Sequence, residues 1–389
     1  MSTDLRREEV LPSDYVSAQA HLVARVWDPV SRGPRVCIVN GEHLVDVTSL
    51  VPTVSELMED TTRINELVES GSVGWSIQDV IDGSLGGRES DPRFLAPVDL
   101  QVVKACGVTF VGSLIERVIE EKCAGDSARQ EQVRAELQGI LGGSLKDIRP
   151  GSSEALKAKE ALIAQGLWSA YLEVGIGPDP EVFTKAPVLA SVGFGAHVGI
   201  PSFSTWNNPE PELVLIVNSR GLPVGATLGN DVNLRDVEGR SALLLGKAKD
   251  NNASSALGPF IRLFDDSFSL ESVATEEISL VVEGQDGFRL EGKNSVSQIS
   301  RPLTELVSAT YGTHHQYPDG FALYTGTLFA PTQDRDTPGQ GFTHKSGDRV
   351  RISSPHLGTL VNTTASTVDL APWTFGIRDL YRYLSSLSS

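Results

Sequence analysis

Apolar and polar residues alternate over residues 34–51, around an Asn40-Gly41 pair. A period of two is typical of half-buried strands, and an Asn-Gly pair favours the positive φ angles of a tight hairpin turn. Apolar residues then recur at helical spacing between Thr53, which can cap a helix, and Gly71, which can end one. The chain is therefore predicted to begin with a small sheet followed by a helix.

A stretch with few apolar residues, rich in glycine, proline and aspartate, covers residues 81–99. Such composition is typical of loops, so we place a domain boundary near residue 95. The prediction is an N-terminal domain over residues 1–95 and a catalytic domain over residues 96–389. A length of 389 residues agrees with roughly two domains.

The larger domain changes its pattern along the chain. A short apolar strand is predicted over 100–110, and helical spacing follows over 114–121, 129–141 and 153–174. After about residue 180, short β-type runs alternate with glycine and proline. The sequence therefore predicts an α+β fold, with a small N-terminal α/β domain followed by a mainly β domain that carries a helical insert.

Charge and composition exclude several classes of protein. The chain has 33 basic and 50 acidic side chains, a net charge of −17, which disfavours nucleic acid and anionic membrane surfaces as partners. No apolar run is long enough to span a bilayer or to serve as a signal peptide. The three cysteines, Cys37, Cys106 and Cys123, form no CxxC pair. We therefore expect a cytoplasmic enzyme or binding protein.

Carboxylates gather around one predicted hairpin. Glu210 and Glu212 stand at the start of the apolar run 213–217, and an i, i+2 pair on a strand points to one face of the sheet. The returning segment brings Asp231 towards them. Three carboxylates without a nearby histidine or thiolate suit Mg²⁺ or Mn²⁺. The alternative is that the two glutamates are solvated charges on an edge strand.

Seven short motifs then occur in a fixed order: PEVFTKAP (180–187), PEPELVLIV (209–217), GNDVNLRD (229–236), LGKAKD (245–250), ALGPFI (256–261), YTGT (324–327) and HLGTLVN (356–362). In this order they resemble the motif series of the fumarylacetoacetate hydrolase superfamily, over roughly residues 105–363. The resemblance implies a mainly β domain of that fold and a metal site formed by Glu210, Glu212 and Asp231. It also implies a functional Arg235, and Lys247 as the lysine of the GK motif.

One departure from the hydrolases bears on the reaction. Hydrolytic members carry a histidine where this chain has Ser113, whereas Glu116 keeps an acidic position. A serine without a base of its own is not a general base near neutral pH. With its helical insert, the chain looks like the branch that dehydrates 2-keto-3-deoxy-pentonates, derived from D-xylose or D-arabinose, to 2,5-dioxopentanoate in pentose catabolism. The resemblance also implies at least a homodimer, or a homotetramer.

The chemistry of that reaction assigns roles to the remaining residues. We expect Lys247 to remove the C3 proton and Glu116 to protonate the departing C4 hydroxyl, although the two roles are exchangeable. The alternative for Lys247 is a structural counter-ion of the acidic cluster. The alternative for Glu116 is a solvated position on the face of a charged helix. Arg235 is expected to buttress the metal carboxylates. For substrate binding we expect the small hydroxyls and one aromatic ring of two motifs, namely Thr109, Phe110, Ser113, Thr325 and Thr327.

Two other functions use the same residues. A hydrolase or decarboxylase of a β-diketo acid, of the fumarylpyruvate or acylpyruvate type, would need the same metal triad. A noncatalytic binding protein for sugar acids would keep the fold without the chemistry. The favoured prediction is a Mg²⁺-dependent hydro-lyase for a small 2-keto-3-deoxy sugar acid.

Overall fold

The computed structural model describes residues 5–107, 109–110, 114, 118, 135–136, 148–329, 331, 333–336 and 341–387. Its largest sheet contains β1 (Leu22–Asp28), β2 (Gly33–Asn40), β3 (His43–Asp46), β4 (Ser72–Ser76), β5 (Arg93–Leu95), β6 (Val102–Gly107), β7 (Glu181–Ala186), β10 (Pro211–Val217), β11 (Pro223–Asp231), β13 (Ser255–Leu263) and β16 (Phe321–Tyr324). The strands follow the order β4-β3-β2-β1-β13-β11-β10-β16-β6-β7, and β5 pairs with β1.

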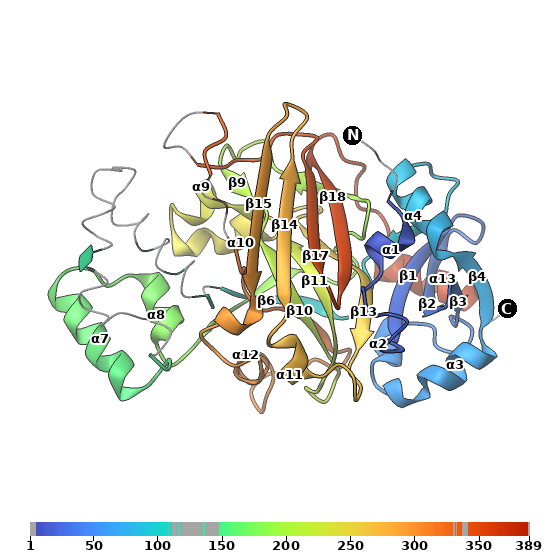
Figure 1. Cartoon of the computed structure of the whole chain (residues 1–389), viewed down its shortest axis with the longest axis horizontal. Helices are drawn as coiled ribbons and strands as arrows, with labels where there is room; N and C mark the ends of the chain where they lie inside the picture. The colour runs from blue at the N-terminus through green and yellow to red at the C-terminus, as the bar shows by residue number, and fades with distance from the viewer. Residues whose placement is uncertain are drawn as a thin grey trace.

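A second sheet packs against the first (Figure 1). It contains β8 (His197–Ile200), β14 (Glu277–Glu283), β15 (Arg289–Ser295), β17 (Arg349–Ser354) and β18 (Gly358–Ser366), in the order β15-β14-β17-β18-β8. A short ladder joins β9 (Asn207–Asn208) to β12 (Asn233–Leu234).

The helices are short and lie around these sheets. They are α1 (Arg7–Val10), α2 (Val54–Leu57), α3 (Ile64–Ser70), α4 (Ile77–Gly86), α7 (Ser153–Ala164), α8 (Ala170–Ile176), α9 (Arg235–Glu238), α10 (Leu245–Lys249), α11 (Leu270–Val273), α12 (Leu303–Thr310) and α13 (Ile377–Leu387). The mixture of sheets and helices confirms the predicted α+β class. No helix among the described residues is long and apolar enough to cross a membrane.

The N-terminal hairpin forms as predicted, with its turn shifted by one residue. Asn40 pairs with His43, so the turn consists of Gly41, at φ 60°, and the residue after it. Thr53 caps α2 as expected, and α3 ends at Gly71, but the predicted helix is interrupted between the two. Because β1 pairs with β13, the large sheet runs across the proposed domain boundary, which itself remains a prediction.

Strand β10 shows how the core is divided. All of its residues are buried, and they alternate between two apolar clusters. Leu213 and Leu215 belong to the cluster between the two sheets, whereas Val214 and Ile216 face the cluster that α2 and α3 cover. By the same period of two, Glu212 lies on the face of Val214, away from the second sheet.

The helical insert has an apolar cluster of its own, at the left of Figure 1. Ala155, Leu162, Leu172 and Ile176 are buried in it. The helix predicted over 153–174 is divided into α7 and α8, with Gly166 between them at φ 70°. The helices predicted over 114–121 and 129–141 lie mostly outside the described residues.

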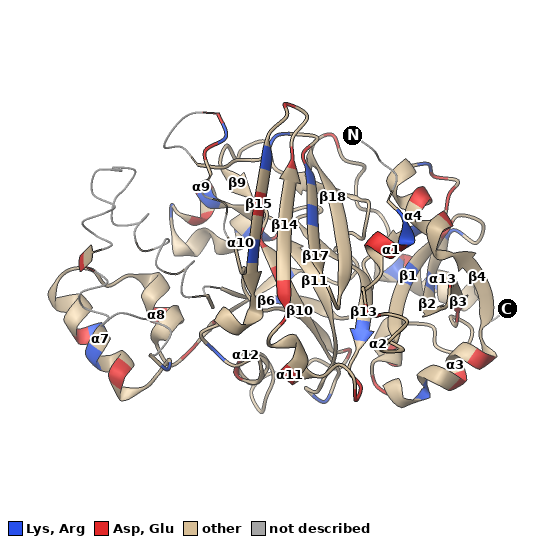
Figure 2. Ribbon diagram, in the orientation of Figure 1, with Lys and Arg blue, Asp and Glu red and all other residues tan. Residues whose placement is uncertain are grey.

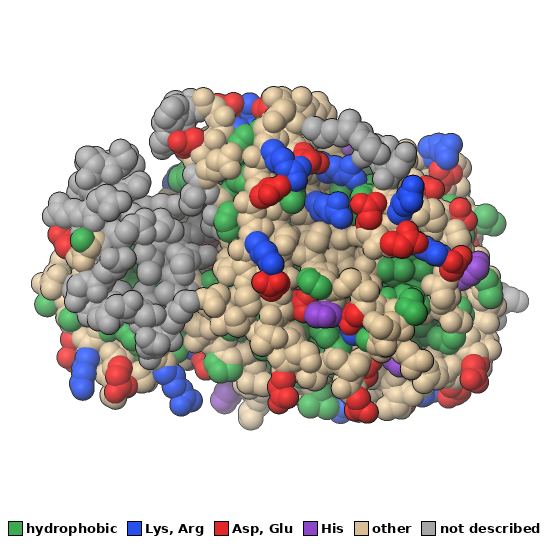
Figure 3. All heavy atoms as spheres, in the orientation of Figure 1, with side chains coloured by type: hydrophobic (Ala, Val, Ile, Leu, Met, Phe, Trp, Pro, Cys, Tyr) green, Lys and Arg blue, Asp and Glu red, His purple; other side chains and the backbone are tan. Residues whose placement is uncertain are grey.

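Charges of both signs are interspersed on the elements in Figure 2, and the space-filling view of the same face shows no region of a single sign (Figure 3). Among the described residues, the carboxylate group that could hold a metal ion is buried. It lies at the ends of β10 and β11.

Candidate active site

The structure brings the three predicted metal ligands together. Glu210 directly precedes β10, Glu212 lies within it, and Asp231 ends the neighbouring strand β11. The Asp231 amide donates a hydrogen bond to the Glu210 carbonyl at 3.0 Å, which fixes the register of the two strands at this point. One carboxylate oxygen from each residue lies within 4.8 Å of the others, and all three side chains are buried. The spacing therefore produced the predicted cluster.

Two buried lysines contact this triad. Lys249 Nζ lies 2.5 Å from Glu210 Oε2 and 3.1 Å from Asp231 Oδ2. Lys185 Nζ lies 2.7 Å from Asp231 Oδ1, and it also donates hydrogen bonds to the carbonyls of Val232 and Lys249. Both oxygens of Asp231 therefore face an amine.

The two amines differ in their electrostatic surroundings. Burial lowers the pKa of Lys249, but the charges of Asp231 and Glu210 outweigh burial, so the net pKa is raised. Burial also lowers the pKa of Lys185, and there the nearby Asp231 compensates only in part, so its pKa stays below the ordinary lysine value. Without a metal, Lys249 is thus the amine that more firmly retains its proton.

Burial and two neighbouring carboxylates disfavour a negative charge on Glu212. The Gly326 amide donates a hydrogen bond to Glu212 Oε2 at 2.7 Å. Burial, and then the charges of Asp231 and Glu210, nevertheless raise the pKa of Glu212 well above its ordinary value. Three carboxylates against two ammonium groups leave a buried excess of negative charge. These hard oxygen donors therefore fit a divalent cation such as Mg²⁺ or Mn²⁺.

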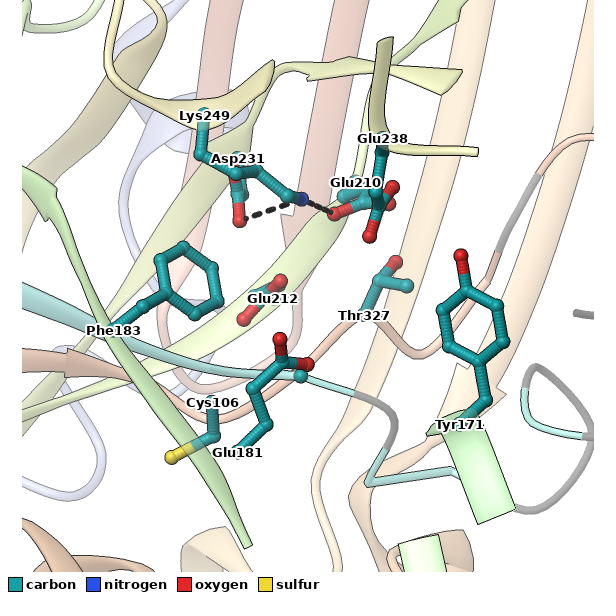
Figure 4. Close-up of a pocket in the computed structure, with 11 residues that line it drawn as sticks. Cys106, Tyr171, Glu181, Phe183, Glu210, Glu212, Asp231, Glu238, Lys249 and Thr327 are labelled. Carbon is teal, nitrogen blue, oxygen red and sulfur yellow. Dashed lines mark hydrogen bonds and ion pairs between the residues drawn. The ribbon is translucent and has the colours of Figure 1, made fainter. Parts of the chain in front are cut away.

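The triad borders a cavity (Figure 4). Its described lining residues are Cys106, Gly107, Tyr171, Glu181, Phe183, Glu210, Glu212, Asp231, Glu238, Lys249 and Thr327. Glu181 and Glu238 add two carboxylates outside the triad. Asn233 ties one of them to the metal site, because its Nδ2 donates to Glu210 Oε1 at 3.1 Å and to Glu238 Oε2 at 2.6 Å. The cavity thus combines a metal-type cluster with groups able to transfer protons.

Lys247 is not brought to this cavity. Its side chain is exposed, and its Nζ lies 4.6 Å from the centre of the Phe203 ring. Residues two apart on a helix point about 200° apart, so the short helix α10 turns Lys249 inward and Lys247 outward. The lysine of the site is therefore Lys249, in the same LGKAKD motif, and the expectation for Lys247 is corrected accordingly.

Of the predicted substrate-binding residues, one lines the cavity and three of the others make contacts elsewhere. Thr327 lines the cavity. Thr109 Oγ1 donates to the Thr325 carbonyl at 2.6 Å, and Thr325 Oγ1 donates to the Leu213 carbonyl at 3.0 Å, so these two hydroxyls hold backbone together. Phe110 is buried in the core cluster between the sheets. Thr109, Thr325 and Phe110 are not among the described lining residues.

Arg235 is buried on α9, but it is not among the described lining residues either. Its Nη1 donates to the Pro331 carbonyl at 3.2 Å, and its guanidinium group lies 4.7 Å from the centre of the Trp206 ring. These contacts link α9 to Pro331 and to Trp206. Ser113 and Glu116 lie outside the described residues.

Several residues of the site were missed by the sequence analysis. They are Lys185, Glu181, Tyr171, Asn233, Glu238 and Lys249. Lys185 and Glu181 belong to the PEVFTKAP motif, which was noticed without a role being given to its charged residues. The pairing of β7 with β6 shifts register at Lys185, so strand alternation alone does not relate the two side chains.

The chain is similar in sequence to two curated dehydratases of 2-keto-3-deoxy sugar acids. No family model matches the chain. It is 32% identical over 196 residues to a probable 2-keto-3-deoxyxylonate dehydratase of Haloferax volcanii, over 50% of this chain and 64% of that protein. It is 30% identical over 182 residues to the 2-dehydro-3-deoxy-D-arabinonate dehydratase of Saccharolobus solfataricus, over 47% and 57% of the two chains. Each match therefore spans less than two thirds of the curated relative.

Solved structures show the fold. The 2-keto-3-deoxy-D-arabinonate dehydratase complexed with magnesium and 2,5-dioxopentanoate superimposes with a TM-score of 0.62 at 21% identity, over 89% of this chain and 99% of that chain. A fumarylacetoacetate hydrolase from Exiguobacterium antarcticum gives a TM-score of 0.53 at 15% identity, over 89% and 99%. The chain thus has the fold of fumarylacetoacetate hydrolases. Together with the sequence relatives, this confirms the resemblance to that superfamily and to its dehydratase branch.

Proposed function

We propose that this chain is a metal-dependent hydro-lyase that converts a 2-keto-3-deoxy-pentonate to 2,5-dioxopentanoate. The observation that carries the proposal is the buried Glu210, Glu212 and Asp231 triad with Lys249 hydrogen-bonded to it at the cavity wall. The names of the sequence relatives point to the same substrate class.

The metal is held, in this proposal, by Glu210, Glu212 and Asp231, with Mg²⁺ as the first choice and Mn²⁺ as the alternative. A divalent cation there would neutralise the carboxylate of a 2-keto acid, polarise its C2 carbonyl and offset the anionic field that keeps Lys249 protonated. Every other step belongs to side chains of the chain itself.

We assign removal of the C3 proton to Lys249. Its amine contacts two carboxylates of the triad, so it lies next to C2 and C3 of a substrate whose keto-acid end is held there. The ring of Phe183, 5.9 Å from Lys249 Nζ at its centroid, covers the amine on one side and limits its contact with water.

Glu181 takes the role that the sequence analysis gave to Glu116. In Figure 4, Glu181 reaches into the cavity from β7, with Glu212 between it and Lys249 in this view. A carboxylic acid at this position can give its proton to the C4 hydroxyl, which leaves as water while the C3–H electrons form the C3–C4 double bond. Elimination gives a C3–C4 unsaturated 2-keto acid. A proton then leaves C5 and another is added at C3, and the C4–C5 enol formed in this way becomes the C5 aldehyde of the product.

Substrate trials with mass detection test this function. The protein is stripped with a chelator, reloaded with Mg²⁺ or Mn²⁺, and given 2-keto-3-deoxy-pentonates of both C4 configurations beside an acylpyruvate. We expect a metal-dependent product lighter by one water from a pentonate. Faster cleavage of the acylpyruvate into two fragments would instead identify a C–C hydrolase, and tight binding without turnover would identify a binding protein.

The quaternary structure is part of the same proposal. We expect a homodimer or a homotetramer, to be measured as the molar mass in solution by light scattering. A monomeric mass in the active preparation would contradict it.

A further inference from the structure

Asn233 is a buried asparagine of β12 whose side chain contacts the metal triad. Its Nδ2 donates to Glu210 Oε1 at 3.1 Å and to Glu238 Oε2 at 2.6 Å. A side-chain amide nitrogen carries two hydrogens, so carboxylates use both of them. The opposite orientation of the amide would turn its oxygen towards two negative groups. The two carboxylates therefore determine how the amide of Asn233 is oriented.

The two oxygens of the Glu210 carboxylate have different partners. Asn233 holds Oε1, whereas Lys249 Nζ lies 2.5 Å from Oε2. A carboxylate held at both oxygens cannot rotate about its last side-chain bond without losing a hydrogen bond. Asn233 therefore helps to fix the plane of the Glu210 carboxylate.

The backbone brings Asn233 and its partners together. Because β12 pairs with β9, Asn233 lies opposite Asn208, two residues before Glu210. Glu238 is the last residue of α9, the short helix that follows β12 directly. The donor and both acceptors are thus placed by one short ladder and one helical turn.

Glu238 adds a charge to the site from outside the triad. It lines the cavity beside Glu210 (Figure 4). Two neighbouring carboxylates repel each other, and the amide of Asn233 offsets part of this repulsion by donating to both. Burial lowers the pKa of Lys249, and the charge of Glu238 is among those that raise it. The negative charge of Glu238 therefore acts on the groups around the triad.

We propose that Asn233 is a positioning residue of the metal site: its amide orients Glu210 for a divalent cation and holds the charge of Glu238 beside it. The inference rests on the proposed function, because that function makes Glu210 a metal ligand. Groups that hydrogen-bond to ligating carboxylates typically contribute about 10- to 100-fold in metal affinity. Their orientation matters most for Mg²⁺, which demands near-ideal octahedral geometry, and less for Ca²⁺, which accepts flexible coordination.

The experiment measures cation affinity in three variants. Asn233→Ala removes the amide. Glu238→Gln removes a charge but keeps an oxygen that can accept from Asn233. The matched control is Asn362→Ala, since Asn362 is also buried and its Nδ2 also makes two hydrogen bonds, to the carbonyls of Gly193 and Ala196 at 3.0 Å each. None of these three residues is among the described lining residues of the cavity. Chelated protein is titrated with Mg²⁺ and with Ca²⁺ by calorimetry, and the melting temperature is recorded without metal.

Asn233→Ala should lose about 10- to 100-fold in Mg²⁺ affinity and less in Ca²⁺ affinity, so the preference for Mg²⁺ should fall. Glu238→Gln should weaken both cations to the same extent, because it changes the charge near the site but not the hydrogen bond to Glu210. Asn362→Ala should lower the melting temperature and keep the Mg²⁺ affinity of the wild type.

An unchanged Mg²⁺ affinity in Asn233→Ala, or a loss that Asn362→Ala matches, overturns the role of Asn233. An equal loss for the two cations in Asn233→Ala overturns its orienting role. Failure of Asn233→Ala to fold, beside a folded Asn362→Ala, makes Asn233 a structural residue and also overturns the inference. Absence of Mg²⁺ binding by the wild type overturns the proposed function as well, so the wild-type titration distinguishes the two failures.

Discussion

Lys185 Nζ lies 2.7 Å from Asp231 Oδ1, and the Lys185 side chain is fully buried. The same amine donates to backbone carbonyls of Val232 and Lys249, so it joins the end of β11 to the end of α10. The amine of Lys185 thus positions both the carboxylate of Asp231 and the backbone of Lys249. It does not line the cavity.

Lys185→Met should therefore weaken metal binding and stability together. Removing one partner of a buried ion pair leaves an uncompensated charge, which typically costs about 3 to 5 kcal/mol of unfolding free energy. We expect a lower melting temperature and a weaker Mg²⁺ affinity by calorimetry. Lys104→Met is the control, because Lys104 is hydrogen-bonded to Thr184 on the same strand as Lys185 and lies outside the metal cluster. Equal losses in both variants would contradict the positioning role.

Glu212→Gln tests the triad. The change keeps the shape of the side chain and the contact with the Gly326 amide, but removes one negative charge from the cluster. Mg²⁺ affinity and dehydration should both be lost, while the melting temperature of the metal-free protein should rise, since burial and two neighbouring carboxylates disfavour a negative charge at this position. Full activity of thoroughly chelated wild-type protein would refute the metal site.

The carboxylate cluster was predictable because its geometry is local. An i, i+2 pair on a strand and a carboxylate at the end of the next strand depend only on strand alternation and one antiparallel register. The choice between Lys247 and Lys249 depends instead on the phase of the short helix α10 against β11. Composition and motif spacing contain no information on that phase.

The hydroxyl groups of Thr109 and Thr325 show a related limit. Thr109 and Thr325 were expected to bind substrate, but both donate hydrogen bonds to buried carbonyls, and only the tertiary structure reveals these partners. The contribution of Tyr171 could not be predicted either. It depends on where Arg301 fixes α8 relative to the body.

A buried histidine outside the site predicts how stability depends on pH. Burial lowers the pKa of His344 below its ordinary value of 6.5, despite a contact of its Nδ1 with Asp348 at 3.2 Å. The folded state therefore binds this proton less readily than the unfolded state, so the contribution to stability is full above about pH 6.5 and is lost as the pH falls through the folded pKa. The melting temperature should fall between pH 7.5 and pH 5.5, and His344→Gln should reduce that fall.

His314→Gln is the control for this titration, because His314 is exposed. It should leave the pH dependence of the wild type unchanged. An identical slope for His344→Gln and the wild type would show that other groups cause the loss of stability.

Lys249→Met and Lys247→Met form a matched pair on one short helix. Both remove an amine, but only Lys249 contacts the triad. Loss of a general base typically costs ~10²- to 10⁴-fold in rate, so Lys249→Met should lose about that much in kcat. Metal binding should persist in this variant, since a positive charge that competes for Glu210 and Asp231 is removed. Lys247→Met should keep nearly full activity.

Deuterium exchange separates a base from a structural counter-ion at Lys249. A substrate analogue without the C4 hydroxyl cannot lose water, but its C3 proton can still be removed and returned. In D₂O and with metal, the wild type and Lys247→Met should introduce deuterium at C3, and Lys249→Met should not, as followed by NMR. Exchange by Lys249→Met at the wild-type rate would transfer the role of base to Glu181, the carboxylate that reaches into the cavity from β7. Lys249 would then act only by balancing the charge of Glu210 and Asp231.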